Sequence, residues 1–169
     1  MHIDDLKRRY EYGFWANRKL FDVIAQLTPE EFTRNVAGSY GSVRNTLVHL
    51  MSTEWGWVAR CGGHPRGDAL KAVDYATKES VIDQWSRVEG YVRDFLATMT
   101  DQDLNAPIEF EVPSTGKRAM PRGELLEHGV NHGVHHRGQI GLLLRALGHV
   151  PGNFDVLFYD IANRAVGTS

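Results

Sequence analysis

Apolar residues recur at spacings of three and four over four long stretches, and this pattern constrains the fold more than any other feature of the chain. A period near 3.6 residues places such residues on one face of an α-helix. In the first stretch the series begins at Ile3 and continues through Leu6, Tyr10 and Leu20 to Leu27. Ser42 is placed to cap the second helix, and Pro121 to open the fourth. Helices are predicted over residues 3–27, 43–61, 78–99 and 121–147.

Shorter elements are expected between and after these helices. Thr28 and Pro29 are typical of a cap followed by the first turn of a short helix. Residues 108–112 alternate between apolar and acidic side chains, so a small hairpin or an extended loop is predicted near 106–118. A short terminal helix is expected over 154–166. The chain is therefore predicted to be all-α, a four-helix bundle that forms a single domain over residues 1–169.

The composition is that of a folded soluble domain. Apolar residues make up 42% and charged residues 24% of the 169 residues, and the net charge is −2. The chain has no basic stripe to neutralise phosphates, so no nucleic-acid partner is expected. Charged residues occur within the first nine positions, and no apolar run reaches the ~18 residues of a membrane span, so neither a secretory signal nor a membrane partner is expected. The single cysteine, Cys61, excludes an intrachain disulfide, and a cytoplasmic location is predicted.

Two histidines at the spacing i, i+4 dominate the fourth predicted helix. At about 100° per residue, His132 lies in the same arc as Leu125 and Leu143, and His136 flanks that arc, so both histidines face the core. A buried imidazole without a partner costs roughly 1–3 kcal/mol. Two imidazoles that project from one face toward one point suit a metal ion. The alternative is a polar seam in which the histidines are hydrogen-bonded to other groups.

Four glycines within the same helix also need an explanation, because each costs about 1 kcal/mol relative to alanine. Close packing of a neighbouring helix would offset this cost, and metal binding would do the same. The four are Gly129, Gly133, Gly138 and Gly141.

The outer face of the fourth helix is unusual for a surface exposed to solvent. Arg137 is expected to point outward there, beside small and apolar residues. Such a face predicts a homodimer contact, although a neighbouring loop would cover it equally well. His128 and His135 lie at the edge of the inward arc and beyond it, so they are expected either to support the metal ligands or to lie on the surface. The small and apolar residues are Val130, Val134, Gly141 and Leu144.

Of the remaining histidines, only His49 is predicted to lie within a helix. Its face would line a cavity or would lie against solvent, and the spacing alone does not decide between the two. Asn17 interrupts the apolar seam of the first helix, where it either lines the same cavity or sets the register of the helices. The residues that share the face of His49 are small or polar: Asn45, Thr46, Ser52, Thr53 and Gly56.

Three segments resemble the motifs of one known group of proteins, the DinB/YfiT-like superfamily. The run NHGVHHRGQ at 131–139, followed by LLLRALG at 142–148, resembles the fourth-helix signature of that superfamily. The segment 48–50, VHL, is similar to its other histidine motif, and 14–17, FWAN, to its first-helix pattern. The resemblance covers nearly the whole chain. It implies a four-helix bundle of up-down-down-up topology, frequent homodimers, and a divalent metal ion held by His49, His132 and His136.

The resemblance also implies a range of activities. Members of the superfamily include thiol-dependent S-transferases and a thiol-dependent isomerase, and many have no known reaction. The predicted function is a metal-dependent enzyme, of hydrolase or thiol-dependent S-transferase type. Its substrate would be a small molecule, with a low-molecular-weight thiol among the candidates. The alternatives are a metal-binding or stress-response protein without turnover, and a structural bundle without bound metal.

The predicted chemistry depends on the open position of a three-histidine site. Three neutral imidazoles leave the cation its full charge, so that a bound water or thiol becomes a nucleophile. Zinc, nickel and iron all accept imidazole ligands, and the sequence does not choose among them. Asn17, Asn45 and Gln139 are predicted to contact the ligands or the substrate. No residue is assigned as a catalytic acid or base.

Overall fold

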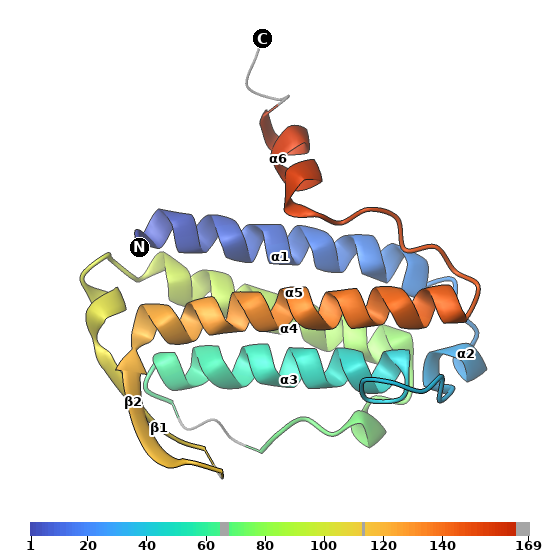
Figure 1. Ribbon diagram of the computed structural model, residues 1–169, viewed down its shortest axis with the longest axis horizontal. Coiled ribbons are helices and arrows are strands. Elements are labelled where there is room, and N and C mark those ends of the chain that lie inside the picture. Colours follow the sequence, from blue (N-terminus) through green and yellow to red (C-terminus); the bar gives the residue numbers. More distant parts are fainter. Residues whose placement is uncertain (65–67, 113, 165–169) are drawn as a thin grey trace.

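Four long helices form the body of the protein, and the computed structural model describes residues 1–64, 68–112 and 114–164 (Figure 1). The predicted bundle with a small hairpin is confirmed. The long helices are α1 (Ile3–Ile24), α3 (Val43–Cys61), α4 (Lys78–Ala97) and α5 (Arg122–Ala146). The shorter elements are α2 (Pro29–Thr33), the 3-10 helices η1 (Ala72–Asp74) and η2 (Asp103–Asn105), the strands β1 (Pro107–Val112) and β2 (Gly116–Pro121), and α6 (Val156–Arg164).

The four long helices follow the expected up-down-down-up order. In Figure 1, α1 and α5 run in one direction, whereas α3 and α4 run in the other. The segment between α3 and α4 therefore returns along the length of the bundle before α4 begins. Each long helix packs against two others: α5 contacts α3 and α1, and α4 contacts the same two helices. This arrangement places α3 beside α5, the two helices that carry the predicted metal ligands.

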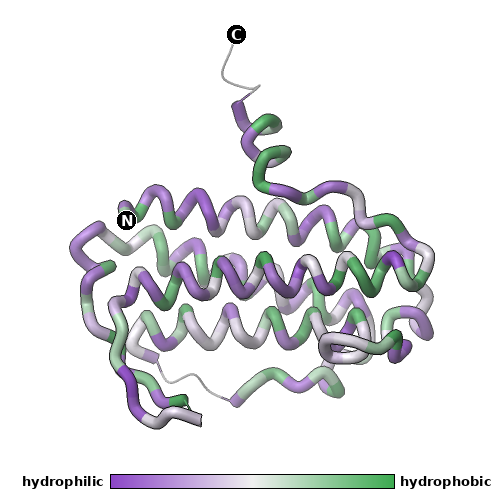
Figure 2. The backbone as a smooth tube through the Cα atoms, viewed as in Figure 1, coloured by the Kyte–Doolittle hydropathy of each residue, from purple (hydrophilic) through white to green (hydrophobic). Residues whose placement is uncertain are grey.

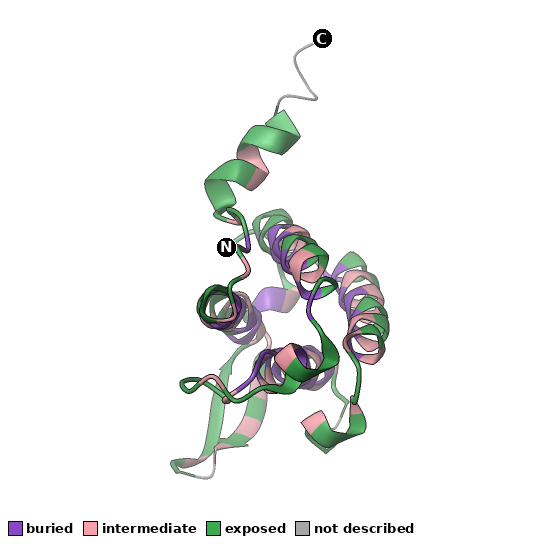
Figure 3. Cartoon of the chain, turned by 90° about the vertical axis from the view of Figure 1, so that its right-hand side faces the viewer, coloured by how far each residue is buried: buried purple, intermediate pink, exposed green. Residues whose placement is uncertain are grey.

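The core lies between the inward faces of these helices, as the end-on view in Figure 3 shows. Trp85 on α4 is fully buried, and its ring meets that of Phe21 nearly edge-on at a centroid distance of 5.5 Å. Complete burial of a large apolar side chain stabilises the fold by roughly 1.5–3 kcal/mol. Other fully buried members are Leu6, Phe14, Leu20, Leu47, Leu50, Met51, Leu125 and Leu126.

Hydrophilic residues interrupt the apolar ones along every long helix (Figure 2). This alternation gives each helix one face for the core and one for solvent. Among the described helices, none has both the length and the apolar character that crossing a membrane requires.

The helix ends follow local capping chemistry more closely than hydrophobic periodicity. The Ser42 hydroxyl accepts a hydrogen bond from the backbone N–H of Asn45, as predicted for a cap of α3. Thr28 and Glu31 form a reciprocal capping box at α2. By contrast, α1 ends before Leu27 and α4 ends before Met99, although both side chains remain buried. The apolar spacing therefore predicted correctly that Leu27 and Met99 are buried, but it overestimated the lengths of the two helices.

The hairpin lies where it was predicted and is slightly longer. Strands β1 and β2 pair antiparallel, with Pro107 opposite Pro121 and Val112 opposite Gly116. Ile108 and Phe110 on β1 pack against the core. The second strand continues to the start of α5, so the hairpin leads directly into the helix that carries two of the histidines.

Arg137 corrects one expectation from the sequence, because it points into the bundle and is only 2% exposed. Its Nη1 donates a hydrogen bond to Oδ1 of Asn17 on α1, at 3.3 Å. Asn17 in turn donates to Oε1 of Glu89 on α4, at 3.4 Å. Glu54 on α3 is also buried, and burial raises the pKa of its carboxyl group to about 7, against the lowering effect of Arg137. One polar layer thus joins all four long helices.

Missing side chains explain why this arginine can be buried. A Cβ atom at Gly133 would lie 2.9 Å from Nη1 of Arg137, and a Cβ atom at Gly13 would lie 3.5 Å from it. The guanidinium group occupies the space that these glycines leave between α1 and α5. The helical wheel of α5 alone assigns Arg137 to the outside because it takes no account of the neighbouring helix.

The C-terminal segment covers part of the outer face of α5. The ring of Phe154 lies 3.3 Å from where a Cβ atom at Gly141 would be, and Leu144 is fully buried. For Gly141, covering by another part of the chain is the alternative that holds, whereas Leu144 belongs to the core. Val134, in contrast, remains 47% exposed. Part of the surface predicted to mediate dimerisation is therefore occupied by the chain itself.

Helix α6 projects from the bundle beyond α1 (Figure 1). The ring of Tyr159 packs against the rings of Tyr12 and Trp15, and Asp160 forms an ion pair with Arg8. Helix α6 also exposes four large apolar residues. The last two positions of the predicted terminal helix, 165 and 166, lie outside the described residues. The exposed large apolar residues of α6 are Val156, Leu157, Phe158 and Ile161.

Candidate metal centre

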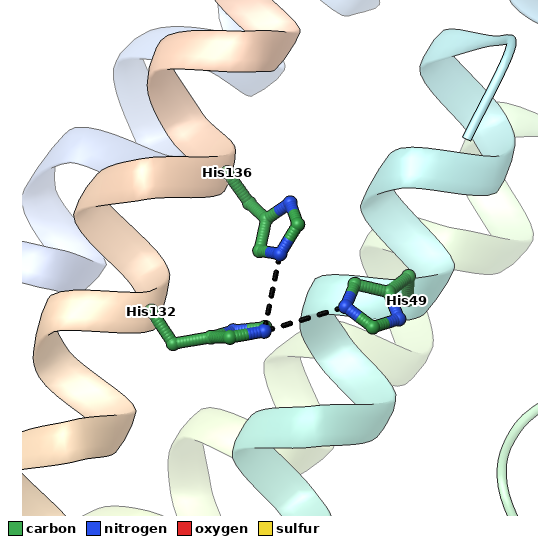
Figure 4. Close-up of side chains that lie close together, drawn as sticks. All are labelled: His49, His132 and His136. Carbon is green, nitrogen blue, oxygen red and sulfur yellow. Dashed lines mark hydrogen bonds between the residues drawn. The ribbon is translucent and has the colours of Figure 1, made fainter. Parts of the chain in front are cut away.

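Three histidines from two helices converge at one point between α3 and α5 (Figure 4). His132 and His136 project from successive turns of α5, and His49 projects from α3 toward them. The Nε2 atom of His132 lies 3.1 Å from Nε2 of His136 and 3.3 Å from Nε2 of His49. The structure thus brings together the three side chains that the resemblance implied as ligands.

The separations between these nitrogens suit a single metal ion. Zinc binds imidazole nitrogen at about 2.0–2.1 Å, and tetrahedral angles then place two such nitrogens roughly 3.3–3.4 Å apart. The observed separations of 3.1 and 3.3 Å are close to that value. One atom from each of the three residues lies within 4.8 Å of the other two. Three protein ligands leave a position open in a tetrahedral site.

The protonation of the imidazoles also suits a cation. Burial, reinforced by the neighbouring imidazoles, lowers the pKa of His132 to about 3. Burial also lowers the pKa of His136, although the hydrogen bond to Gln139 opposes this shift. Both rings are therefore neutral at pH 7. Metal binding at neutral pH then requires no proton to leave these two ligands.

Gln139 fixes the orientation of His136. Its Oε1 atom lies 2.6 Å from Nδ1 of His136 and accepts a hydrogen bond from it. A proton on Nδ1 leaves the lone pair on Nε2, the atom that points at the other two histidines. The Oε1 atom also accepts from the hydroxyl of Ser39 at 2.6 Å, and the Gln139 amide donates to Nε2 of His135 at 2.9 Å. Gln139 therefore connects a candidate ligand to the loop before α3.

One known family matches nearly the whole chain. The sequence model of the DinB family matches residues 3–165. The chain belongs to the DinB family. Protein DinB of Bacillus subtilis (strain 168) is 28% identical over 155 residues, which cover 89% of this chain and 90% of that protein. The uncharacterized protein YizA of the same organism is 28% identical over 138 residues, 82% of this chain and 85% of YizA.

Solved structures share the fold of this DinB-family chain. A DinB-like protein from Bacillus cereus ATCC 10987 superposes with a TM-score of 0.72 at 24% identity, covering 90% of this chain and 97% of the other. YfiT from Bacillus subtilis superposes with a TM-score of 0.69 at 19% identity, covering 86% and 89% of the two chains. YfiT is described as a probable metal-dependent hydrolase with an unusual four-helix bundle topology. At these identities the likeness shows the fold.

The other residues predicted for the site lie at different distances from the three histidines. Gln139 contacts His136 directly, and His135 is exposed and linked to it through Gln139. The ring of His128 is 5.9 Å from that of His132 and packs edge-on against Trp57.

Two asparagines were also predicted to contact the ligands or the substrate. The amide of Asn45 donates to the backbone carbonyl of Tyr40, at 3.1 Å. Asn17 belongs to the polar layer, where it contacts Arg137 and Glu89. The two thus differ: Asn45 holds the loop beside the centre, and Asn17 joins α1 to α5 and α4.

Sequence reasoning missed Tyr40, which contacts the centre of this DinB-family bundle from the loop before α3. Its hydroxyl oxygen lies 3.0 Å from Nε2 of His49, and the two rings stack at a centroid distance of 4.0 Å and an interplanar angle of 22°. The Tyr40 ring is also 5.8 Å from that of His136. An aromatic residue between Ser39 and Gly41 in a loop is only a weak indication of a functional site. Helical periodicity does not apply to it, because it lies outside the helices.

A hollow of about 290 Å³ adjoins the centre on the α3 side. Tyr40 and His49 form one part of its wall, so the hollow and the histidine cluster share His49. Among the described residues, its lining combines amide and hydroxyl groups with small apolar side chains. The remaining lining residues are Asn45, Val48, Ser52, Thr53, Ala69, Leu70 and Ala72.

Proposed function

We propose that this DinB-family protein holds one divalent metal ion with His49, His132 and His136 and acts as a metal-dependent enzyme. The observation that supports the proposal most strongly is the convergence of three imidazoles. The Nε2 atom of His132 lies 3.1 Å from that of His136 and 3.3 Å from that of His49, and these separations are typical of ligands on one ion. Neutral imidazoles leave the cation its full charge. Bound in this way, a metal ion would supply a Lewis acid and a nucleophilic water or thiolate at its open position.

The class of reaction that we propose is hydrolysis or thiol-dependent group transfer. YfiT, which shares the fold, is described as a probable metal-dependent hydrolase, and this analogy of fold supports the first class. For the second class, the thiol would come from the substrate. Cys61 is fully buried at the end of α3, and burial raises the pKa of its thiol to about 11. Its thiol is therefore protonated at neutral pH and enclosed by the core.

The residues around the centre would orient ligands and receive the substrate. Gln139 holds His136 with its Nε2 lone pair toward the other two rings. The hollow beside His49 would accept a small molecule, and its described lining offers hydrogen-bonding groups at Asn45, Ser52 and Thr53. We propose zinc, nickel or iron as the ion, because each accepts nitrogen ligands of this kind.

The second candidate is a bundle in which the histidines stabilise one another without a metal ion. The distances of 3.1 and 3.3 Å between ring nitrogens are also hydrogen-bonding distances. In that case the cluster would join α3 to α5 as an internal polar contact. A metal-binding protein without turnover would have the same centre but would leave the hollow without a substrate.

Metal analysis of the full chain, purified without an affinity tag, separates these candidates. We expect about one metal ion per chain in the wild-type protein, and none in His132→Ala, which removes the nitrogen central to the cluster. Circular dichroism should show that the variant keeps its helices. His64→Ala, at an exposed histidine, is the matched control and should retain the metal. Full metal content in His132→Ala, or none in the wild type, would overturn the proposal.

A further inference from the structure

Tyr40 is held over the histidine cluster by contacts on both sides of its loop. The side chain of Asn45 donates to the carbonyl oxygen of Tyr40, and the hydroxyl of Ser39 donates to Gln139 on α5. Gly41 donates from its backbone N–H to the carbonyl of Gly38, at 2.8 Å, which closes a turn around Tyr40. The loop is therefore attached to α3 and α5, the two helices that supply the histidines.

The backbone of this loop adopts conformations that side chains normally avoid. Ala37 has a φ of 68° and Ser39 a φ of 45°, both in the left-handed region. For residues other than glycine, such conformations cost of order 1 kcal/mol each and persist only where the surrounding structure imposes them. They occur more often at ligand sites than elsewhere. Here they place Tyr40, the residue after Ser39, against His49.

The Tyr40 hydroxyl has a partner in this structure that a bound metal ion would take away. The oxygen lies 3.0 Å from Nε2 of His49, the atom that would coordinate the ion. A metal-bound Nε2 has neither a proton nor a lone pair to share. The hydroxyl would then lie within a few ångströms of the ion without its former partner. The hydroxyl would therefore be available to donate a hydrogen bond to a molecule bound at the centre.

We propose that Tyr40 is a substrate-contacting residue whose hydroxyl donates a hydrogen bond to the atom in the open coordination position. The inference rests on the proposed function, because it requires a metal ion at the three histidines. It defines the ligand as a molecule that coordinates through an oxygen or sulfur atom with a spare lone pair. The hollow that Tyr40 and His49 border would receive the rest of that molecule.

Two probes that coordinate metals differ in the property that matters for this role. The thiolate sulfur of 2-mercaptoethanol keeps lone pairs after it binds a metal, so Tyr40 can donate to it. The coordinating nitrogen of free imidazole keeps none. Cobalt(II) is a convenient ion for the test, because its visible absorption reports both metal binding and the arrival of each probe.

The test compares wild-type protein with Tyr40→Phe, which keeps the ring and removes the hydroxyl. We expect Tyr40→Phe to bind cobalt within about threefold of the wild type and to bind 2-mercaptoethanol about tenfold more weakly. Tenfold corresponds to ~1.4 kcal/mol, the size of a hydrogen bond to a charged group. Imidazole affinity should be unchanged. Tyr91→Phe, at a tyrosine that packs on Trp55, is the control and should behave like the wild type.

Each other outcome rejects a particular part of the proposal. Equal thiol affinity in wild type and Tyr40→Phe would show that the hydroxyl does not contact the bound atom. A loss of cobalt affinity of more than tenfold in Tyr40→Phe would make Tyr40 a metal ligand instead. An equal weakening of both probes would indicate a general disturbance of the site. Absence of cobalt from the wild-type protein would overturn the proposed function itself, and the role of Tyr40 with it.

Discussion

Three imidazole side chains carry the chemistry that we propose for this DinB-family protein. Their nitrogens are close enough to share one cation, and for His132 and His136 the fold lowers the pKa so that the rings are neutral. The lowered pKa also makes the stability of the fold sensitive to acid. Adding a proton to a buried ring beside other imidazoles is unfavourable, so acid favours the unfolded chain. Gln139 orients the His136 ring, because its Oε1 atom accepts a hydrogen bond from Nδ1 of His136.

Acid should destabilise the metal-free protein partly through His132. Its pKa is about 3 in the folded chain, against an ordinary value of 6.5, so between these values the unfolded chain binds the proton more readily. The contribution of the neutral ring is complete above pH 6.5 and is lost as the pH falls toward 3. We expect the free energy of unfolding of the wild type, minus that of His132→Gln, to decrease steadily from pH 7 to pH 4.

This difference should be measured by urea unfolding in the presence of a chelator. The raised pKa of Glu54 gives an opposite slope as the pH falls through 7, but it is present in both proteins and cancels. His64→Gln, at an exposed histidine, should show no comparable change. A difference that does not vary with pH would contradict the pKa shift of His132.

At the scale of elements, α5 combines the site and the packing that allows it. Two of its four internal glycines face groups from other parts of the fold, and a third faces a side chain of α5 itself. Gly129 lies opposite the Tyr10 hydroxyl, Gly133 opposite the guanidinium of Arg137, and Gly141 opposite Phe154. Close packing therefore explains these three residues. Gly138 differs, because no described atom outside its own helical surroundings lies within 4 Å of where its Cβ atom would be.

Alanine substitutions at two of these glycines should have opposite effects on stability. Gly138→Ala should raise the free energy of unfolding by up to about 1 kcal/mol, through helix propensity alone. Gly133→Ala should lower it, because its Cβ atom would lie 2.9 Å from Nη1 of an arginine that is buried and cannot move aside freely. Urea unfolding of both variants at neutral pH is the measurement. Stabilisation by Gly133→Ala would show that the guanidinium is not confined there.

For the whole molecule, the centre joins helices that lie far apart in the sequence. His49 belongs to α3 and the other two candidate ligands belong to α5, so a bound ion would attach one helix to the other. The polar layer around Arg137 has a similar position in the fold, since it contains one residue from each long helix. Metal binding should consequently stabilise the bundle as a unit.

Addition of zinc should therefore raise the melting temperature of the wild-type protein. A ligand at a hundred times its dissociation constant contributes about 2.7 kcal/mol when it binds only the folded state. His49→Ala should show a much smaller rise, because two ligands on one helix remain. Thermal unfolding followed by circular dichroism, with and without zinc, checks this. An equal rise in both proteins would place the bound zinc elsewhere.

The predicted homodimer also belongs to this scale. Helix α6 exposes Leu157, Phe158 and Ile161, and Val134 on α5 is exposed as well. We propose that the protein is a homodimer, so light scattering should give twice the mass of one chain. Replacing Leu157 and Ile161 by glutamate should lower that mass if α6 takes part in the contact. A monomeric mass for the wild type would contradict the prediction.

Much of this protein was already determined by local sequence. Hydrophobic spacing, caps such as Ser42 and the alternation at 108–112 predicted the helices and the hairpin, because each depends on residues only a few positions apart. The pairing of His132 with His136 was predicted for the same reason, since a spacing of four on a helix fixes direction. The resemblance of the sequence motifs to one family implied His49 as the third metal ligand and the up-down-down-up topology.

Only the tertiary structure decided which surfaces meet. The helical wheel left His49 between a cavity and solvent, assigned Arg137 to the wrong side, and gave no indication of Tyr40. Each of these positions depends on a neighbouring helix or loop: α5 faces His49, glycines on α1 and α5 admit Arg137, and a strained loop carries Tyr40. A helix has a periodic face of its own, but the identity of what packs against that face is a property of the assembled bundle.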